Sequence, residues 1–268
     1  MDRIAEWFNN FDQELDPPGC ETVFVPSRTG KQDCCTVGIV HEHRFAFYYW
    51  GLYSHTRGKK PLPILITLDS HDDIGVPSEV IPRDLDSLNL GNHAELALFS
   101  WLRLRSLNDG HILPALYLNF FSDVYVLNKP QDSLVFRAPN SKMEFVDRGG
   151  NIHAVKFYRQ ADKLMRDIPP EIPVYLDIDL DYFAVSNSQA DDLLGSENLQ
   201  PDGEIKKHLS LKSPFMMLLL NRLVGLTIAL EPKYCGGLLN SYHLLDILNR
   251  EFFDGTLCTH SCNWANKF

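Results

Sequence analysis

Acidic and imidazole side chains recur at alternate positions in two short stretches of the sequence. The first stretch is Asp69-Ser-His-Asp-Asp73, in which carboxylates flank His71. The second contains Asp177 and Asp179, with Asp181 two residues further on. Carboxylate oxygens with one or two imidazoles favour manganese over zinc, although cobalt, nickel or iron could substitute. Two bridged cations activate water for hydrolysis, so these stretches predict a binuclear metal site in a hydrolase.

Apolar runs typical of buried strands precede both stretches and recur elsewhere in the chain. Four strong strands are predicted at residues 36–40, 62–68, 172–179 and 223–230. A fifth is predicted at residues 112–118, and shorter strands and turns between 124 and 158. Helices are predicted at residues 45–53, from Asn92 to about 107, and after Gly237 to about 252. This alternation predicts an α/β fold with three layers (α/β/α) around a mainly parallel sheet.

The carboxyl ends of parallel strands meet at one edge of a sheet, and ligands bind beyond that edge. The four strong strands end beside His41 and His43, beside the two acidic stretches, and beside Glu231. So many carboxylates brought together without a cation would repel one another, and burial would increase the cost. A pair of divalent cations removes this repulsion.

Length and composition limit the possible classes of protein. The 268 residues suit a single domain, and a net charge of −10 argues against nucleic acid as a partner. No apolar run is long enough to cross a membrane, and no secretory signal is evident at the start. We therefore expect a cytoplasmic protein. Cys258 and Cys262 lack a second pair of ligands and are expected in an exposed tail.

Three motifs resemble those of the arginase and agmatinase superfamily, the ureohydrolases. They are Val40-His-Glu-His43, Leu68-Asp-Ser-His71 and Leu176-Asp-Ile-Asp-Leu-Asp-Tyr-Phe183. They are most similar to an arginase-like family that contains peptide arginases, and the resemblance covers about residues 37–253. It implies an arginase/deacetylase-like fold and two Mn²⁺ ions. It also implies conversion of arginine to ornithine in a precursor peptide, with release of urea.

The resemblance also implies a ligand set. One manganese would be held by His43, Asp69, Asp73 and Asp177. The other would be held by Asp69, His71, Asp177 and Asp179, with Asp69 and Asp177 bridging. His43 is preferred to His41 because it aligns with the family's histidine. Asp72 and Asp181 are expected to lie behind the ligands or in solvent.

Further roles follow from the same resemblance. Glu231 would pair with the substrate guanidinium, or else be an ordinary surface glutamate at a strand end. Asp73 would pass a proton to the departing amine, and His93, at a predicted helix start, would shuttle protons. His111 is the competing candidate for the shuttle.

Three other functions remain open. The substrate could be free arginine, agmatine or another small guanidino compound, although the loop at residues 74–82 departs from the arginase pattern of Asn, Thr and Ser. A deacetylase with one zinc would need an adjacent histidine pair, which the sequence lacks. A non-catalytic module could keep the metals for structure alone.

Overall fold

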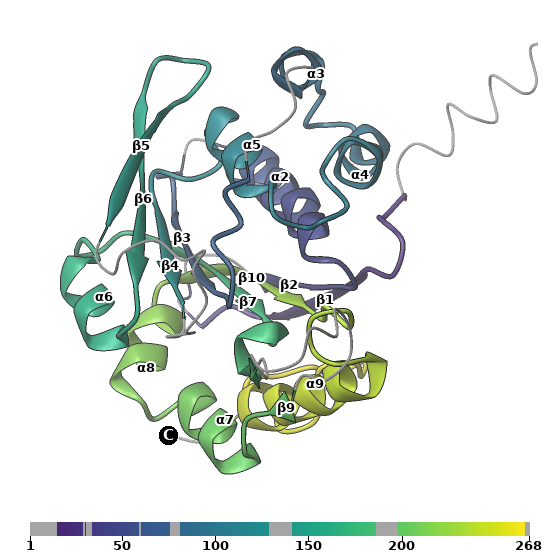
Figure 1. Ribbon diagram of the computed structural model, residues 1–268, viewed down its shortest axis with the longest axis vertical. Coiled ribbons are helices and arrows are strands. Elements are labelled where there is room, and N and C mark those ends of the chain that lie inside the picture. The colour runs from purple at the N-terminus through teal and green to yellow at the C-terminus, as the bar shows by residue number, and fades with distance from the viewer. Residues whose placement is uncertain are drawn as a thin grey trace, which may run out of the picture.

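The computed structural model describes residues 15–28, 30, 34–58, 60–75, 81–128, 141–185 and 198–265. Its centre is an eight-stranded sheet in the order β1-β2-β10-β7-β3-β4-β6-β5 (Figure 1). The strands are β1 (Glu21–Pro26), β2 (Cys34–Val40), β3 (Ile64–Leu68), β4 (Val124–Leu127), β5 (Lys142–Val146), β6 (Ile152–Tyr158), β7 (Val174–Asp179) and β10 (Leu223–Ala229). The six inner strands pair in parallel, and only β1 and β5 are antiparallel to their neighbours.

Helices cover both faces of this sheet, so the predicted three layers are present (Figure 1). One face carries α2 (Ala46–Thr56), α3 (Ile81–Ser87), α4 (His93–Leu102) and α5 (Ile112–Tyr117). The other carries α6 (Ala161–Asp167), α7 (Asp202–Leu209), α8 (Pro214–Leu220) and α9 (Leu238–Phe253). Every residue of β3, β7 and β10 is buried, which explains their continuous apolar sequences. A separate apolar core packs on each face.

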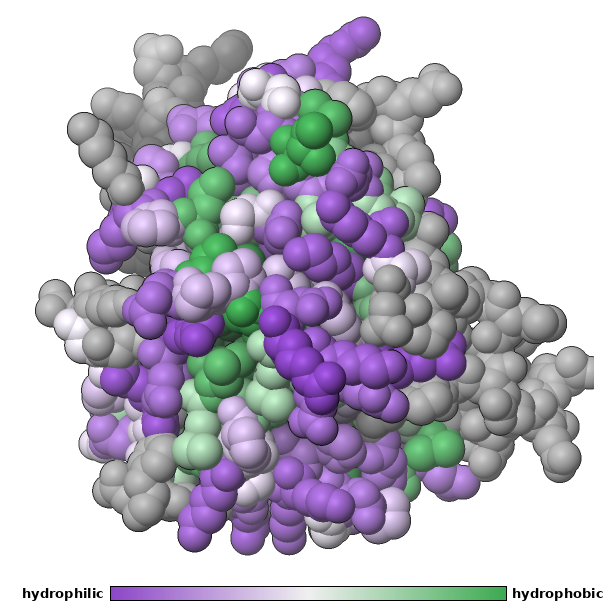
Figure 2. Space-filling model, turned by 90° about the vertical axis from the view of Figure 1, so that its left-hand side faces the viewer, coloured by the Kyte–Doolittle hydropathy of each residue, from purple (hydrophilic) through white to green (hydrophobic). Residues whose placement is uncertain are grey.

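Two short 3₁₀ helices and a small second sheet complete the described elements. The 3₁₀ helices are η1 (His43–Phe45) and η2 (Leu180–Phe183), and the small sheet pairs β8 (Ala184–Val185) with β9 (Asn198–Leu199). The side of the molecule where β5, β6 and α6 lie is mainly hydrophilic, with small separated apolar areas (Figure 2). None of the described helices combines the length and apolarity needed to cross a bilayer.

The predicted strand at residues 112–118 is wrong, because these residues form helix α5. A short apolar run fits a buried strand or a buried helix equally well, so periodicity alone could not separate them. Pro114 lies in the first turn of the helix, where its missing N–H costs no intrahelical hydrogen bond. The predicted strands at 36–40, 62–68, 172–179 and 223–230 are confirmed, with ends shifted by one or two residues.

The carboxyl-terminal segment packs against the fold, which differs from the exposed tail expected from sequence. Cys262 is buried although Cys258 is exposed. The indole Nε1 of Trp264 donates to the Pro26 carbonyl at 2.7 Å, and the Ala265 N–H donates to Phe252 at 2.7 Å. These bonds attach the segment to β1 and α9.

The four strands that carry the predicted site residues are adjacent in the sheet, as β2, β10, β7 and β3. Val40, Ala229 and Asp179 stand level with one another at the carboxyl edge. Leu68 pairs with Ile178, so the next residue, Asp69, reaches the level of Asp179. The fold therefore brings residues from distant parts of the chain to one edge.

Candidate metal centre

His43 lies at the centre of an acidic cluster at this edge. It opens η1 just after β2, and its side chain is fully buried. Its Nδ1 lies 2.8 Å from Asp73 Oδ2, 3.0 Å from Asp179 Oδ2 and 3.4 Å from Asp69 Oδ2. His41, the alternative to His43, is exposed.

Two groups of potential metal ligands share the carboxylate of Asp69. In the first group, donor atoms within 4.8 Å of one another come from His43, Asp69, Asp73 and Asp179. In the second, they come from Asp69, His71 and Asp181. His71 Nδ1 lies 2.8 Å from Asp181 Oδ2 and 3.7 Å from Asp69 Oδ1. The carboxylate of Asp69 would thus be available to an ion held by either group.

Hydrogen bonds hold the Asp69–Asp73 segment in place. The His71 N–H donates to Asp69 Oδ1 at 2.5 Å, which curls the segment back on its first carboxylate. From the residue after β4, Asn128 Nδ2 donates to the His71 carbonyl at 2.8 Å and to the Asp69 carbonyl at 3.3 Å. The sequence analysis missed Asn128, although a polar residue directly after an apolar strand was a usable signal.

The end of β7 is attached to the same segment. Asp179 accepts a hydrogen bond from the Asp181 N–H at 3.0 Å, and this bond caps η2. Asp181 in turn accepts from the Ser70 N–H at 3.2 Å, and its carbonyl accepts from the Ser70 hydroxyl at 3.0 Å. These bonds bring Asp181 to His71, whereas the sequence placed it behind the ligands or in solvent.

Asp177 occupies a different place from the one expected. It belongs to none of the donor groups that the described residues form. Its Oδ2 lies 2.7 Å from His43 Nε2, on the opposite side of the ring from the acidic cluster. Because Asp177 lies two residues inside the end of β7, its carboxylate stays within the sheet. Asp179 and Asp181 are the members of this motif that join the donor groups.

Glu231 is buried beside the cluster and is not an ordinary surface glutamate. Its Oε1 accepts from the His43 N–H at 2.5 Å and from Asn108 Nδ2 at 2.6 Å. Burial raises the pKa of the Glu231 carboxyl well above its usual value, and the nearby Asp179 charge adds to this rise. Asn108 is a second residue that the sequence analysis missed, and no local pattern marked it.

Two acidic residues at the site have left-handed backbone conformations. Asp73 has φ of 49° and Glu231 has φ of 38°. Residues other than glycine seldom adopt this region, and it costs about 1–3 kcal/mol. Such residues cluster where tertiary structure holds functional groups in place, which agrees with a role for both carboxylates.

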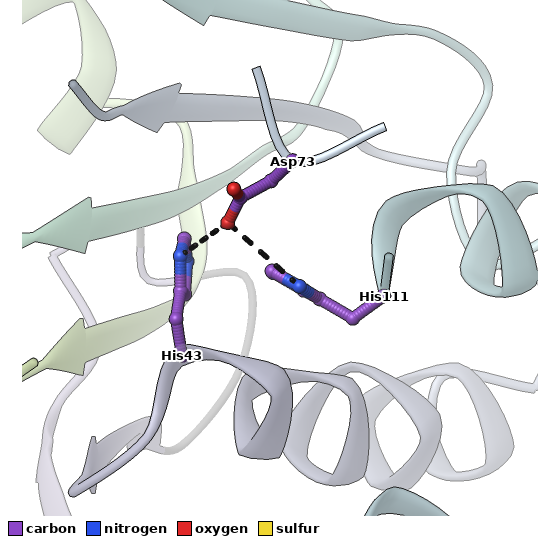
Figure 3. A group of neighbouring side chains, drawn as sticks. All are labelled: His43, Asp73 and His111. Carbon is purple, nitrogen blue, oxygen red and sulfur yellow. Dashed lines mark ion pairs between the residues drawn. The ribbon is translucent and has the colours of Figure 1, made fainter. Parts of the chain in front are cut away.

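Of the two histidines considered as proton shuttle, His111 lies at the cluster (Figure 3). Its ring is fully buried, 4.4 Å from the His43 ring centroid, and its Nδ1 is 3.8 Å from Asp73 Oδ2. Burial and the neighbouring His43 hold the pKa of His111 well below its usual value. His93 begins α4 and is half-buried, and no hydrogen bond or ion pair among the described residues joins it to the cluster.

The charges at the cluster are unbalanced without a cation. Burial and neighbouring carboxylates raise the pKa of Asp69 well above its usual value and that of Asp179 to about 7. Asp69 Oδ2 and His43 Nδ1 are buried and have no hydrogen bond within the described residues. Buried carboxylate oxygens and imidazole nitrogens without hydrogen-bond partners are suitable ligands for divalent cations. Such cations would neutralise the carboxylates and accept the free lone pairs. The described residues can therefore hold metal ions at this edge.

No protein-family model matches the chain, and no curated protein matches it in sequence.

Proposed function

We propose that this protein is a manganese-dependent hydrolase that converts the side chain of arginine in a peptide to ornithine and releases urea. One observation carries the proposal. Asp69 is shared by two groups of carboxylate and imidazole donors, and the buried Glu231 lies next to them. The resemblance of the three sequence motifs to those of ureohydrolases supplies the reaction.

The ligand chemistry supports manganese. Of the six different residues in the two groups, four are aspartates that offer carboxylate oxygen, and His43 and His71 offer imidazole nitrogen. Such a predominantly oxygen set favours Mn²⁺ over softer ions. When bound, two such ions polarise a water molecule for attack on the guanidinium carbon. The shared carboxylate supports two ions, whereas a deacetylase would need one.

The chain's own residues would bind the substrate and move its protons. Glu231 offers a carboxylate to the planar guanidinium, which donates paired, charge-assisted hydrogen bonds. Asp73 accepts the proton that the attacking water loses and delivers it to the departing side-chain amine. The bond between the guanidinium carbon and that amine nitrogen breaks, so urea and ornithine are the products. His111, whose Nδ1 lies 3.8 Å from Asp73 Oδ2, would exchange protons with it.

A peptide substrate is supported by the loop after Asp73. Ureohydrolases that act on free amino acids bind the α-carboxylate and α-amine through a polar loop at this place. The sequence Ile74-Gly-Val-Pro-Ser-Glu-Val-Ile-Pro82 lacks that pattern, and residues 76–80 lie outside the described residues. The net charge of −10 is compatible with a cationic peptide.

The proposal is tested with the Mn²⁺-loaded protein and four kinds of substrate: arginine-containing peptides, matched lysine peptides, free arginine and agmatine. We expect urea and a mass loss of about 42 Da per arginine, only with the arginine peptides. The Asp69→Asn variant should be inactive. Urea from agmatine or free arginine alone would overturn the peptide assignment, and no urea from any guanidino substrate would overturn the reaction.

A further inference from the structure

Asp177 is the one member of its motif whose carboxylate faces away from the acidic cluster, and three hydrogen bonds surround it. It is fully buried on β7, level with Thr67 on β3 and Thr227 on β10. The Thr67 hydroxyl donates to Asp177 Oδ2 at 2.9 Å, and the Thr227 hydroxyl donates to Oδ1. His43 Nε2 supplies the third bond, at 2.7 Å.

Trp50 determines the direction of the hydrogen bond between Thr227 and Asp177. The indole N–H of Trp50 on α2 donates to the Thr227 hydroxyl oxygen at 3.3 Å. Because an indole N–H can only donate, the Thr227 hydroxyl keeps its own proton for Asp177. Trp50, Thr67 and Thr227 are all fully buried, so water does not compete for these partners. Together they hold an acceptor-only carboxylate against the His43 ring.

This arrangement favours a proton on Nε2 of His43, because the Asp177 carboxylate can only accept a hydrogen bond from that nitrogen. With a cation held by the carboxylates that face Nδ1, the neutral ring would then offer the Nδ1 lone pair to that cation. Nδ1 is the atom that faces Asp69, Asp73 and Asp179. The backbone N–H of His43 is held separately by Glu231, so the residue is anchored at both ends.

We propose that Asp177 is a positioning residue that acts through His43, where it fixes the Nε2-protonated tautomer and turns Nδ1 toward the metal. This role rests on the metal centre of the proposed function. It replaces direct ligation by Asp177, which the resemblance to ureohydrolases implied. Outer partners of this kind typically change metal affinity by about 10–100-fold.

A double-mutant cycle tests the inference, with Mn²⁺ affinity measured by calorimetry on the metal-free full chain. Asp177→Asn should weaken Mn²⁺ binding by about 10–100-fold, because the amide can donate to Nε2 and favour the opposite tautomer. In a His43→Gln background the same substitution should change Mn²⁺ affinity by less than about twofold, since the His43 ring through which Asp177 acts is already absent. Equal losses in the two backgrounds would show that Asp177 acts independently of His43 and would overturn the inference.

Two more variants protect the test against simple misfolding. Thr227→Val keeps the Asp177 carboxylate but removes one of its donors, and should weaken Mn²⁺ binding by about 2–10-fold. Asp147→Asn is the matched control, because Asp147 is also buried and accepts from the Asn151 N–H at 2.7 Å, in the β5–β6 turn. It should leave Mn²⁺ affinity unchanged.

The outcomes separate this inference from the proposed function, because the titration contains no guanidino substrate. If the double-mutant cycle shows that Asp177 and His43 are coupled but the protein releases no urea, the inference is supported and the proposed reaction is refuted. Unchanged affinity in Asp177→Asn would overturn the inference even if urea is released. Absence of Mn²⁺ binding by the wild-type protein would also overturn it, since His43 would then have no ion to hold.

Discussion

The backbone N–H of His43 donates to Glu231 Oε1 at 2.5 Å, although 188 residues separate the two in the chain. The bond forms because β2 and β10 are neighbours in the sheet and end at the same level. It places the predicted guanidinium-binding carboxylate beside the histidine of the first donor group. In the proposed function, substrate binding and metal binding would therefore depend on one contact between two strand ends.

Substitution of Glu231 tests its role toward the substrate. Glu231→Gln keeps an oxygen that can accept from His43 but removes the charge that would pair with a guanidinium. We expect kcat/KM for an arginine peptide to fall by about 10–100-fold, as for loss of a hydrogen bond to a charged group. Glu144→Gln, on the exposed side of β5, is the control. Equal kcat/KM in Glu231→Gln and wild type would contradict guanidinium binding by this residue.

The sharing of Asp69 between donor groups predicts the number of ions bound. The wild-type protein should bind two Mn²⁺ per chain. Asp181→Asn should retain one, because Asp181 contributes only to the second group, whereas Asp69→Asn should lose both. Equilibrium dialysis with elemental analysis measures this number. Two ions retained in Asp69→Asn would refute the shared-ligand arrangement.

The stability of the metal-free protein should fall as pH rises. The folded state raises the pKa of Asp179 to about 7, through burial and the Asp181 charge. It also raises the pKa of His71 to about 10, because burial lowers this pKa but is outweighed by the charge and hydrogen bond of Asp181 together with the charges of Asp73 and Asp179. Between the unfolded and folded pKa of each group the native state binds more protons, so the free energy of unfolding falls with rising pH.

Saturating Mn²⁺ should oppose this loss, since the ions replace the protons. At a concentration one hundred times its dissociation constant, one bound ion adds about 2.7 kcal/mol to the free energy of unfolding. Urea-induced unfolding between pH 5 and 9, with chelator or with Mn²⁺, measures both effects. A stabilisation by Mn²⁺ that is larger at pH 5 than at pH 8 would have the wrong sign for ligands that must first lose protons.

The two histidines proposed as proton shuttles should behave differently. His111→Asn should lower kcat by about 10²-fold or more, as for loss of a general acid or base. His93→Asn should change kcat little, because His93 only begins α4. Thermal unfolding of both variants controls for the loss of the His111 ring from its place beside Trp50. A large loss of kcat in His93→Asn alone would restore the role that the resemblance implied.

The main layers and the edge that carries the site could be predicted from local sequence. Each acidic or imidazole motif follows an apolar run, and the four apolar runs that precede these motifs and Glu231 form the buried parallel strands β2, β3, β7 and β10. Asp69, His71 and Asp73 therefore stand where the sequence placed them, at the carboxyl end of β3. The start of α4 directly after Asn92 was also predictable, because asparagine is a favoured capping residue, and its side chain accepts from the Glu95 N–H.

The assignment of roles within the motifs needed the tertiary structure. Asp177, Asp179 and Asp181 are evenly spaced in the sequence, so the spacing does not reveal which two of them join the donor groups. Pairing with the neighbouring strands decides it: Asp177 is level with Thr67 and Thr227 inside the sheet, whereas Asp179 lies at the edge. His111 and α5 are a similar case, because a helix start and an apolar run do not reveal which neighbours they pack against. The pattern of apolar and polar residues along a chain indicates which residues are buried. The distance between two side chains also depends on the register of strands that are far apart in sequence.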